Sequence, residues 1–192
     1  MQEHAPAADV PSPWVRRWHG LAIAGCSALD LACGQGRHAR FLARLGHPVH
    51  AVDRDAAALA ALRGLPGITA VQADLESGSW PLGTLRFGCI VVTNYLHRPL
   101  FPAIVDALED DGLLLYETFA AGNERFGRPS NPAFLLKPGE LLEMVRGRLR
   151  VIAFEDTYTE SPLPAMVQRI AACGPRLSLP GGAARSAPAP IG

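Results

Sequence analysis

The stretch from residue 28 to residue 53 constrains the fold more than any other part of the chain. An apolar run ends in the carboxylate Asp30, a turn follows at Gly34 and Gly36, and a second apolar run ends in Asp53. A helix-like pattern separates the turn from the second run. This order of strand, glycine turn, helix and strand is typical of one repeat of a parallel sheet. We therefore expect two neighbouring strands that each carry a carboxylate at the tip.

Apolar runs and helical patterns continue to alternate along the chain. Most runs are rich in Val, Ile and Leu without strict alternation, which indicates strands buried on both faces of a parallel sheet. The runs at 149–155 and 166–173 have no helix between them, so these two strands should pair antiparallel. The other expected strands are 27–32, 49–53, 68–72, 89–93 and 112–118, and the expected helices are 13–19, 37–45, 56–62, 100–108 and 139–145. The pattern predicts an α/β doubly wound, mostly parallel sheet that ends in an antiparallel hairpin.

The chain of 192 residues suits one domain. We expect a flexible segment over 1–11, the domain over 12–174, and a disordered tail rich in Pro, Ala and Gly over 175–192. The formal net charge is zero, so the sequence carries no strong nucleic-acid signal. A local basic patch is still compatible with this balance.

The four cysteines show no metal-type pairing, and we expect no metal site. No secretory signal pattern begins the chain, and no apolar run approaches the roughly 20 residues of a membrane-spanning helix. These features predict a cytoplasmic protein that does not enter a membrane.

The motifs resemble those of the class I S-adenosylmethionine-dependent methyltransferases. The first motif of that family is an acidic residue followed by G-x-G-x-G, and this chain has Asp30-Leu-Ala-Cys-Gly34-Gln-Gly36. Asp53 matches the acid that ends the second strand of the family. Asp74 matches a weaker acid after the third strand, and residues 93–97 (Thr-Asn-Tyr-Leu-His) stand at the end of the fourth. The finer likeness is to small bacterial members of the tellurite-resistance-like or uncharacterised type.

The resemblance covers about residues 12–173 and implies a Rossmann-like sheet of seven strands. The chain departs from the family pattern at two positions. Ala32 replaces the first glycine of the turn, which must therefore accommodate a Cβ. Gly88 falls where many relatives carry an aspartate before the fourth strand.

The resemblance implies that the cofactor is S-adenosyl-L-methionine and the product S-adenosyl-L-homocysteine. It places Asp30 at the methionine amino group, directly or through water, and Asp53 at the two ribose hydroxyls. The helix that begins at Arg37 would meet the methionine carboxylate. The remaining implied contacts are the turn backbone at Ala32, Cys33, Gly34 and Gly36, the adenine neighbours Arg54, Asp74 and Leu75, and the methionine neighbour Asn94.

Candidates for the chemistry follow the fourth and fifth strands. Tyr95 and His97 are the catalytic candidates, because a base is useful where the acceptor must lose a proton. For His97 the alternative is a polar residue that caps the next helix together with Arg98. Tyr116, at the end of the fifth strand, is a substrate-binding candidate, and its alternative is a hydrogen bond to a neighbouring loop.

Two flanking segments supply further substrate-binding candidates. Trp14 and Arg16 lie on the first expected helix, which would either cover the cofactor or simply pack on the sheet. The long loop 120–137 carries Arg125, Phe126 and Arg128, which would bind an acidic or phosphorylated acceptor or else remain solvated.

The leading functional prediction is methyl transfer by in-line displacement to a small-molecule acceptor. Three alternatives stay open at this point. The domain could bind the cofactor without catalysis, as a subunit or sensor, or it could methylate protein or RNA. The glycine turn followed by Asp53 also satisfies a looser dinucleotide pattern, so a nicotinamide-dependent oxidoreductase is the least favoured alternative.

Overall fold

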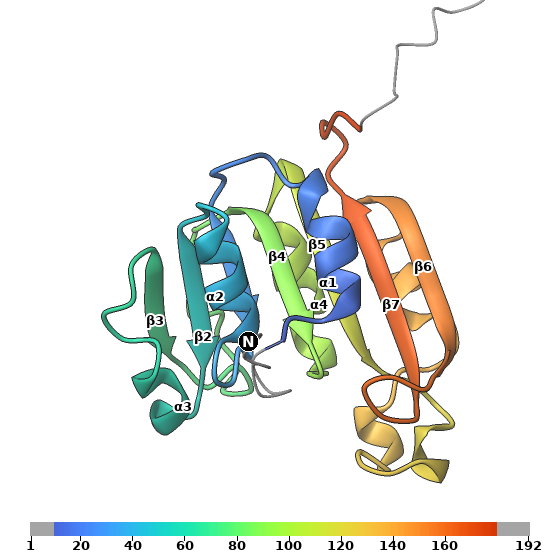
Figure 1. The fold of residues 1–192 in the computed structure, drawn as a ribbon. Helices are drawn as coiled ribbons and strands as arrows, with labels where there is room; N and C mark the ends of the chain where they lie inside the picture. The colour runs from blue at the N-terminus through green and yellow to red at the C-terminus, as the bar shows by residue number, and fades with distance from the viewer. Residues whose placement is uncertain (1–9, 180–192) are drawn as a thin grey trace, which may run out of the picture.

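A computed structural model describes residues 10–179, which form a seven-stranded sheet with helices on both faces (Figure 1). The strand order is β3-β2-β1-β4-β5-β7-β6. Strands β1 to β5 run parallel, and β7 pairs antiparallel with both β5 and β6. The strands are β1 Ala28–Leu31, β2 Val49–Asp53, β3 Ile68–Gln72, β4 Phe87–Thr93, β5 Leu108–Phe119, β6 Arg150–Thr159 and β7 Ala165–Cys173.

The helices are short; α1 precedes the first strand, and the others lie between successive strands. They are α1 Pro13–Trp18, α2 Arg37–Arg44, α3 Ala56–Ala60, α4 Phe101–Asp106 and α5 Glu140–Val145, with 3-10 turns η2 His19–Leu21, η3 Arg98–Leu100, η4 Asn123–Arg125 and η5 Pro132–Phe134. The predicted α/β sheet with a closing antiparallel hairpin is therefore confirmed. Each expected strand and helix is present, and all except β2 and β3 have shifted ends.

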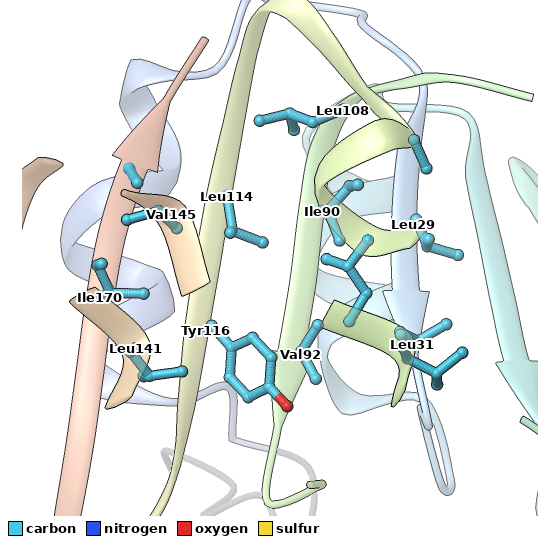
Figure 2. Close-up of a cluster of buried hydrophobic side chains, with 14 of the residues drawn as sticks. Leu29, Leu31, Ile90, Val92, Leu108, Leu114, Tyr116, Leu141, Val145 and Ile170 are labelled. Carbon is cyan, nitrogen blue, oxygen red and sulfur yellow. The ribbon is translucent and has the colours of Figure 1, made fainter. Parts of the chain in front are cut away.

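Two hydrophobic clusters fill the two faces of the sheet. Figure 2 shows one of them, in which side chains of β1, β4 and β5 meet Leu141 and Val145 of α5. The other contains Trp14 and Val15 of α1 and Leu42 of α2, packed on the opposite face. Burial on both faces explains why the central strands read as continuous apolar runs rather than as alternating ones.

The largest difference from the expected bounds concerns β4 and β5. Leu108, expected at the end of a helix, begins β5, because it pairs with Phe87 and is only 2% exposed. Gly88 consequently lies inside β4. A Cβ built on Gly88 would stand 2.5 Å from the Cβ of Cys26, so this packing excludes the aspartate of the family pattern. Tertiary pairing, rather than local pattern, sets these ends.

The described beginning of the expected disordered tail is packed. Leu177 is 7% exposed, and the backbone N–H of Arg176 donates to the carbonyl of Asp110 at 2.9 Å. These contacts hold Arg176 and Leu177 against the protein, at the beginning of the expected tail. The rest of that tail, like residues 1–9 of the expected flexible segment, lies outside the described residues.

Candidate functional site

A cavity of about 350 Å³ opens at the carboxyl ends of the parallel strands, which point downward in Figure 1. Ligands of open α/β sheets bind at this edge. The cavity crosses the ends of β3, β2, β1, β4 and β5. Its lining residues are Ala32, Asp53, Arg54, Ala73, Asp74, Leu75, Glu76, Asn94, Tyr95, Leu96, Thr118, Phe119, Pro129 and Phe134.

The glycine turn after β1 forms one rim of this cavity through Ala32. Ala32, Gly34 and Gly36 all have positive φ, at 54°, 53° and 75°. A Cβ on Gly34 would meet nothing within 4 Å, whereas one on Gly36 would stand 2.5 Å from Leu62. Gly34 therefore leaves space beside the backbone, and Gly36 lets α2 pack closely. Ala32 adopts a conformation that costs a non-glycine residue about 1 kcal/mol.

Asp53 reaches the cavity from the end of β2 and holds the turn in place. One carboxylate oxygen accepts from the N–H of Gly34 at 2.7 Å, and the other accepts from the N–H of Asp55 at 2.9 Å. A carboxylate offers about four acceptor positions, so each oxygen retains one for a hydroxyl. This arrangement fits a ribose diol, as the resemblance implies for this position.

Asp30 lies behind the cavity instead of lining it. It is 1% exposed, and its carboxylate accepts from the N–H of Ala39 in the first turn of α2 at 2.8 Å. Burial raises the pKa of Asp30 to about 8, against the opposing effect of that hydrogen bond. Asp30 thus caps α2 from the neighbouring strand. The chain has no side-chain cap at Gly36, where the helix begins.

Tyr95 follows β4, and its hydroxyl group has no hydrogen-bond partner among the described residues. Within the described part of the chain, its hydroxyl oxygen is buried without a hydrogen bond, although the residue lines the cavity. Burial raises the pKa of Tyr95 to about 12, so the phenol remains protonated. The Tyr116 hydroxyl donates to the Tyr95 carbonyl at 2.9 Å and fixes this backbone. A buried hydroxyl without a protein partner is available to hydrogen-bond a ligand atom or a water molecule.

The fit of the implied cofactor can be tested on these observations. The open side of Gly34, the spare acceptor positions of Asp53 and the unpartnered Tyr95 hydroxyl all suit a polar nucleoside ligand. Asn94, with φ of 54°, is exposed and lines the cavity directly after β4. The residues present therefore accommodate a nucleoside with a polar chain.

Six of the residues expected at the cofactor line the cavity, namely Ala32, Asp53, Arg54, Asp74, Leu75 and Asn94. Cys33 and Arg37 do not line it, and Cys33 is 7% exposed beneath the turn. Gly34 and Gly36 act through the backbone shape described above.

The catalytic and substrate candidates separate into two groups. Tyr95 lines the cavity, whereas His97 does not, and the His97 side chain makes no capping bond either. Tyr116 is fully buried in the core, as its loop-bonding alternative predicts.

The first helix packs on the sheet. Trp14 is 4% exposed, joins the core, and donates its indole N–H to the carbonyl of Ile170 at 3.2 Å. Arg16 lies exposed on α1, and neither residue lines the cavity. These positions favour the packing alternative over a substrate contact.

The three candidates of the long segment lie outside the cavity lining. The guanidinium of Arg125 stands 5.7 Å from the ring of Phe126, and Phe126 packs 5.1 Å from the ring of Tyr158. Arg128 is exposed. The segment nevertheless contributes to the site through two other residues, Pro129 and Phe134.

The residues that sequence reasoning missed are mostly uncharged. They are Ala73, Glu76, Leu96, Thr118, Phe119, Pro129 and Phe134. The position of Thr118 and Phe119 at the end of the fifth strand was a usable signal, because strand ends converge on one edge. Nothing in the local pattern distinguishes Phe134 from Phe126.

Comparison with known proteins supports the same fold class. Residues 28–112 match the family model described as "Methyltransferase domain". TehB from Haemophilus influenzae has a TM-score of 0.67 at 20% identity, over 79% of this chain and 58% of that chain. A TehB-like SAM-dependent methyltransferase from Corynebacterium glutamicum has a TM-score of 0.63 at 22% identity, over 88% and 91%.

The glycopeptide N-methyltransferase MtfA, in a structure with S-adenosyl-L-methionine, has a TM-score of 0.60 at 21% identity, over 84% and 86% of the two chains. A short stretch of 40 residues is 50% identical to "Hemagglutinin 1" of Eikenella corrodens. That match spans 21% of this chain and 13% of the other protein, so it covers only a small part of that relative.

The fold is that of the class I S-adenosylmethionine-dependent methyltransferases, and the resemblance inferred from the motifs is confirmed.

Within residues 10–179, no helix is long and apolar enough to cross a membrane. No group of three or more His, Cys, Asp or Glu side chains in that range is arranged to hold a metal ion.

Proposed function

We propose that this chain binds S-adenosyl-L-methionine in the cavity at the carboxyl edge of the sheet and transfers its methyl group to a small molecule. The observation that carries the proposal is the meeting of Asp53, the open turn at Gly34 and the unpartnered Tyr95 hydroxyl around one cavity. The methyltransferase family match and the TehB and MtfA folds support it.

When bound, the cofactor would supply a methyl group activated by its sulfonium. The acceptor's lone pair would form the new bond to that carbon as the carbon–sulfur bond breaks, and the neutral thioether S-adenosyl-L-homocysteine would be the leaving group. The chain's own contribution is to position the two reactants and to exclude water. Asp53 orients the ribose, and the unpartnered hydroxyl of Tyr95 donates a hydrogen bond to the ligand in the cavity. The proton that the acceptor loses passes to solvent.

Titration calorimetry with S-adenosyl-L-methionine and, separately, with NADH tests the cofactor. We expect binding of the first and none of the second. Binding of NADH alone would establish the nicotinamide alternative. Binding of S-adenosyl-L-methionine without release of S-adenosyl-L-homocysteine on any acceptor class would favour a silent subunit or sensor.

Asp53 is the sharpest single residue for this test. Asp53→Ala should weaken S-adenosyl-L-methionine binding about 10- to 150-fold, the equivalent of about 1.5–3 kcal/mol for charge-assisted hydrogen bonds. Asp53→Asn retains one acceptor oxygen and should lose less. The measurement is the dissociation constant from calorimetry.

Asp55→Ser is the matched control. Asp55 lies two residues away and caps α3 with its side chain, outside the cavity lining, and serine preserves such a cap. Its affinity should equal that of the unaltered protein. Equal S-adenosyl-L-methionine affinities of Asp53→Ala, Asp53→Asn and Asp55→Ser would place the ribose elsewhere and contradict the proposal.

A further inference from the structure

The charges of the cavity lie at one end. Its charged lining residues are Asp53, Arg54, Asp74 and Glu76, and all four belong to the ends of β2 and β3. The opposite end is formed by Thr118 and Phe119 of β5 and by Pro129 and Phe134 of segment 120–137. Among the described residues, no charged side chain lines this second end.

The two ends lie far enough apart for two reactants. The lining runs from β3 across β2, β1 and β4 to β5, which is four strand spacings, or roughly 19 Å. Under the proposed function, the nucleoside occupies the end at Asp53. The end at β5 and Phe134 is then left for the methyl acceptor, so this inference rests on the proposed function.

Two arginines of the surrounding segments, Arg98 and Arg125, are engaged by groups of the protein and do not line the cavity. Arg98 donates to Glu140 at 2.6 and 2.9 Å. Arg125 donates to the carbonyl of Gly122 at 3.4 Å and stands beside Phe126. The lining at this end offers an anionic acceptor no charged side chain, and the whole lining carries three carboxylates against one guanidinium.

The apolar wall is held firmly in place. Arg98 donates to the carbonyls of Ala133 and Leu135, at 2.7 and 2.8 Å, on either side of Phe134. Asn123 is 1% exposed, donates to the carbonyl of Pro129 at 3.0 Å and accepts from the N–H of Met166. The backbone at Phe134 and at Pro129 is therefore fixed before any ligand binds.

The Phe134 ring remains 52% exposed on this fixed support. Covering a half-exposed aromatic ring with an apolar ligand removes apolar surface from water, which stabilises the complex. Among the described residues, no aromatic side chain stacks on the Phe134 ring. Phe126, by contrast, packs against the ring of Tyr158.

We propose that the methyl acceptor is an uncharged small molecule with an apolar ring, which packs against Phe134 and Phe119, and is neither a carboxylic acid nor a phosphate ester. This reverses the acidic acceptor that Arg125 and Arg128 suggest from the sequence. The reversal follows from their positions outside the lining.

The test uses two probes of one shape, 2-naphthol and 2-naphthoate, on the full chain saturated with S-adenosyl-L-homocysteine at neutral pH. Naphthol is uncharged under these conditions and naphthoate is an anion. We expect naphthol to bind at least tenfold more tightly, as measured by calorimetry. Phe134→Ala should weaken naphthol binding about tenfold.

Phe126→Ala is the matched control, because it removes the same ring from the same segment outside the cavity lining. It should leave the naphthol affinity unchanged, and both variants should bind S-adenosyl-L-homocysteine as the unaltered protein does. That second readout also confirms that each variant is folded.

Naphthoate binding as tight as naphthol binding would overturn the inference, as would no binding of naphthol. A naphthol affinity that is the same in Phe134→Ala, or falls equally in Phe126→Ala, would also overturn it. In each of these cases the binding of S-adenosyl-L-homocysteine leaves the proposed function standing. Failure of the unaltered protein to bind S-adenosyl-L-homocysteine would instead remove both.

Discussion

At the scale of single residues, two buried titratable side chains anchor the glycine turn. Asp30 and His38 are each 1% exposed, on β1 and α2. The His38 ring accepts from the N–H of Ser12 at 3.1 Å and lies 3.4 Å from the Thr93 hydroxyl. It thereby joins the beginning of α1, the helix after the turn and the end of β4. Burial lowers the pKa of His38 to about 3, with a smaller contribution from Arg37.

A neutral buried histidine makes stability depend on pH. The unfolded chain takes up a proton on His38 near pH 6.5, whereas the folded chain does not until about pH 3. The unfolded state therefore binds more protons in this window, and stability falls as pH decreases through it. From pH 7 to pH 5, we expect His38 to remove about 2 kcal/mol from the free energy of unfolding.

Asp30 acts in the opposite direction, because its folded pKa is raised from 3.8 to about 8. Its contribution to stability is lost as pH rises through that window, and the two residues partly cancel in the unaltered protein. Urea unfolding of the unaltered protein and of His38→Gln at pH 5 and pH 7 isolates the histidine. Parallel pH profiles for the two proteins would contradict a neutral His38.

Residue by residue, the sequence predicted several of the side chains that line the cavity near the ends of β2, β3 and β4. Asp53, Asp74 and Asn94 follow apolar strands directly, and side chains at the tips of parallel strands converge on one edge. Asp30 satisfies the same pattern and yet faces away, because its carboxylate turns to the N–H of Ala39. The pattern places a residue at a strand end but does not determine which group its side chain contacts.

At the scale of elements, one side chain connects the loop after β4 to the wall of the cavity. Arg98 of η3 reaches Glu140 of α5 and both sides of η5. The hydrogen bond to Glu140 raises the pKa of Arg98, and the pKa of Glu140 is lowered overall by this arginine and the Lys137 N–H, against the effect of burial. Arg98 thus fixes segment 120–137 relative to the sheet.

Arg98→Ala should therefore loosen this segment before it unfolds the domain. We expect faster hydrogen exchange over 120–137 and a loss of about 1–2 kcal/mol in the free energy of unfolding, since the pair is only partly buried. Mass-spectrometric hydrogen exchange measures the first effect and denaturant unfolding the second.

Arg146→Ala is the control, because its ion pair with Glu143 on α5 is largely exposed. Exposed pairs of this kind contribute little, and the variant should unfold at nearly the same denaturant concentration as the unaltered protein. Equal exchange over 120–137 in the two variants would show that Arg98 does not hold the segment.

Elements were more predictable in kind than in extent. The strand over 49–53 and the strand over 68–72 match the structure at both ends. The fifth strand begins at Leu108 instead of residue 112, because its first residues pair with β4 across the sheet. Segment 120–137, expected as a loop, contains η4 and η5 and an Ala120–Leu136 bridge. Its order comes from contacts with distant residues.

At the scale of the whole molecule, one cavity draws on five strands and a distant segment, so a bound ligand should stabilise the entire domain. A ligand present at 100 times its dissociation constant adds about 2.7 kcal/mol to a two-state domain. For a domain of this size, that corresponds to a rise in Tm of roughly 5–10 °C.

Differential scanning calorimetry with S-adenosyl-L-homocysteine measures this rise, with Asp53→Ala as the variant that should lose most of it at the same ligand concentration. NADH at equal concentration should leave Tm unchanged. An equal rise with NADH would indicate nonspecific nucleotide binding.

The sequence by itself determined the fold class, the closing hairpin and the acids at the strand tips. Those features depend on the period of apolar residues and on local turn chemistry, which neighbours in the chain suffice to specify. Tertiary structure alone decided that Asp30 caps a helix, that Trp14 joins the core, and that Phe134 rather than Arg125 reaches the cavity. Each of those outcomes depends on which distant group supplies a hydrogen bond or fills a space, and the order of residues along the chain does not contain that information.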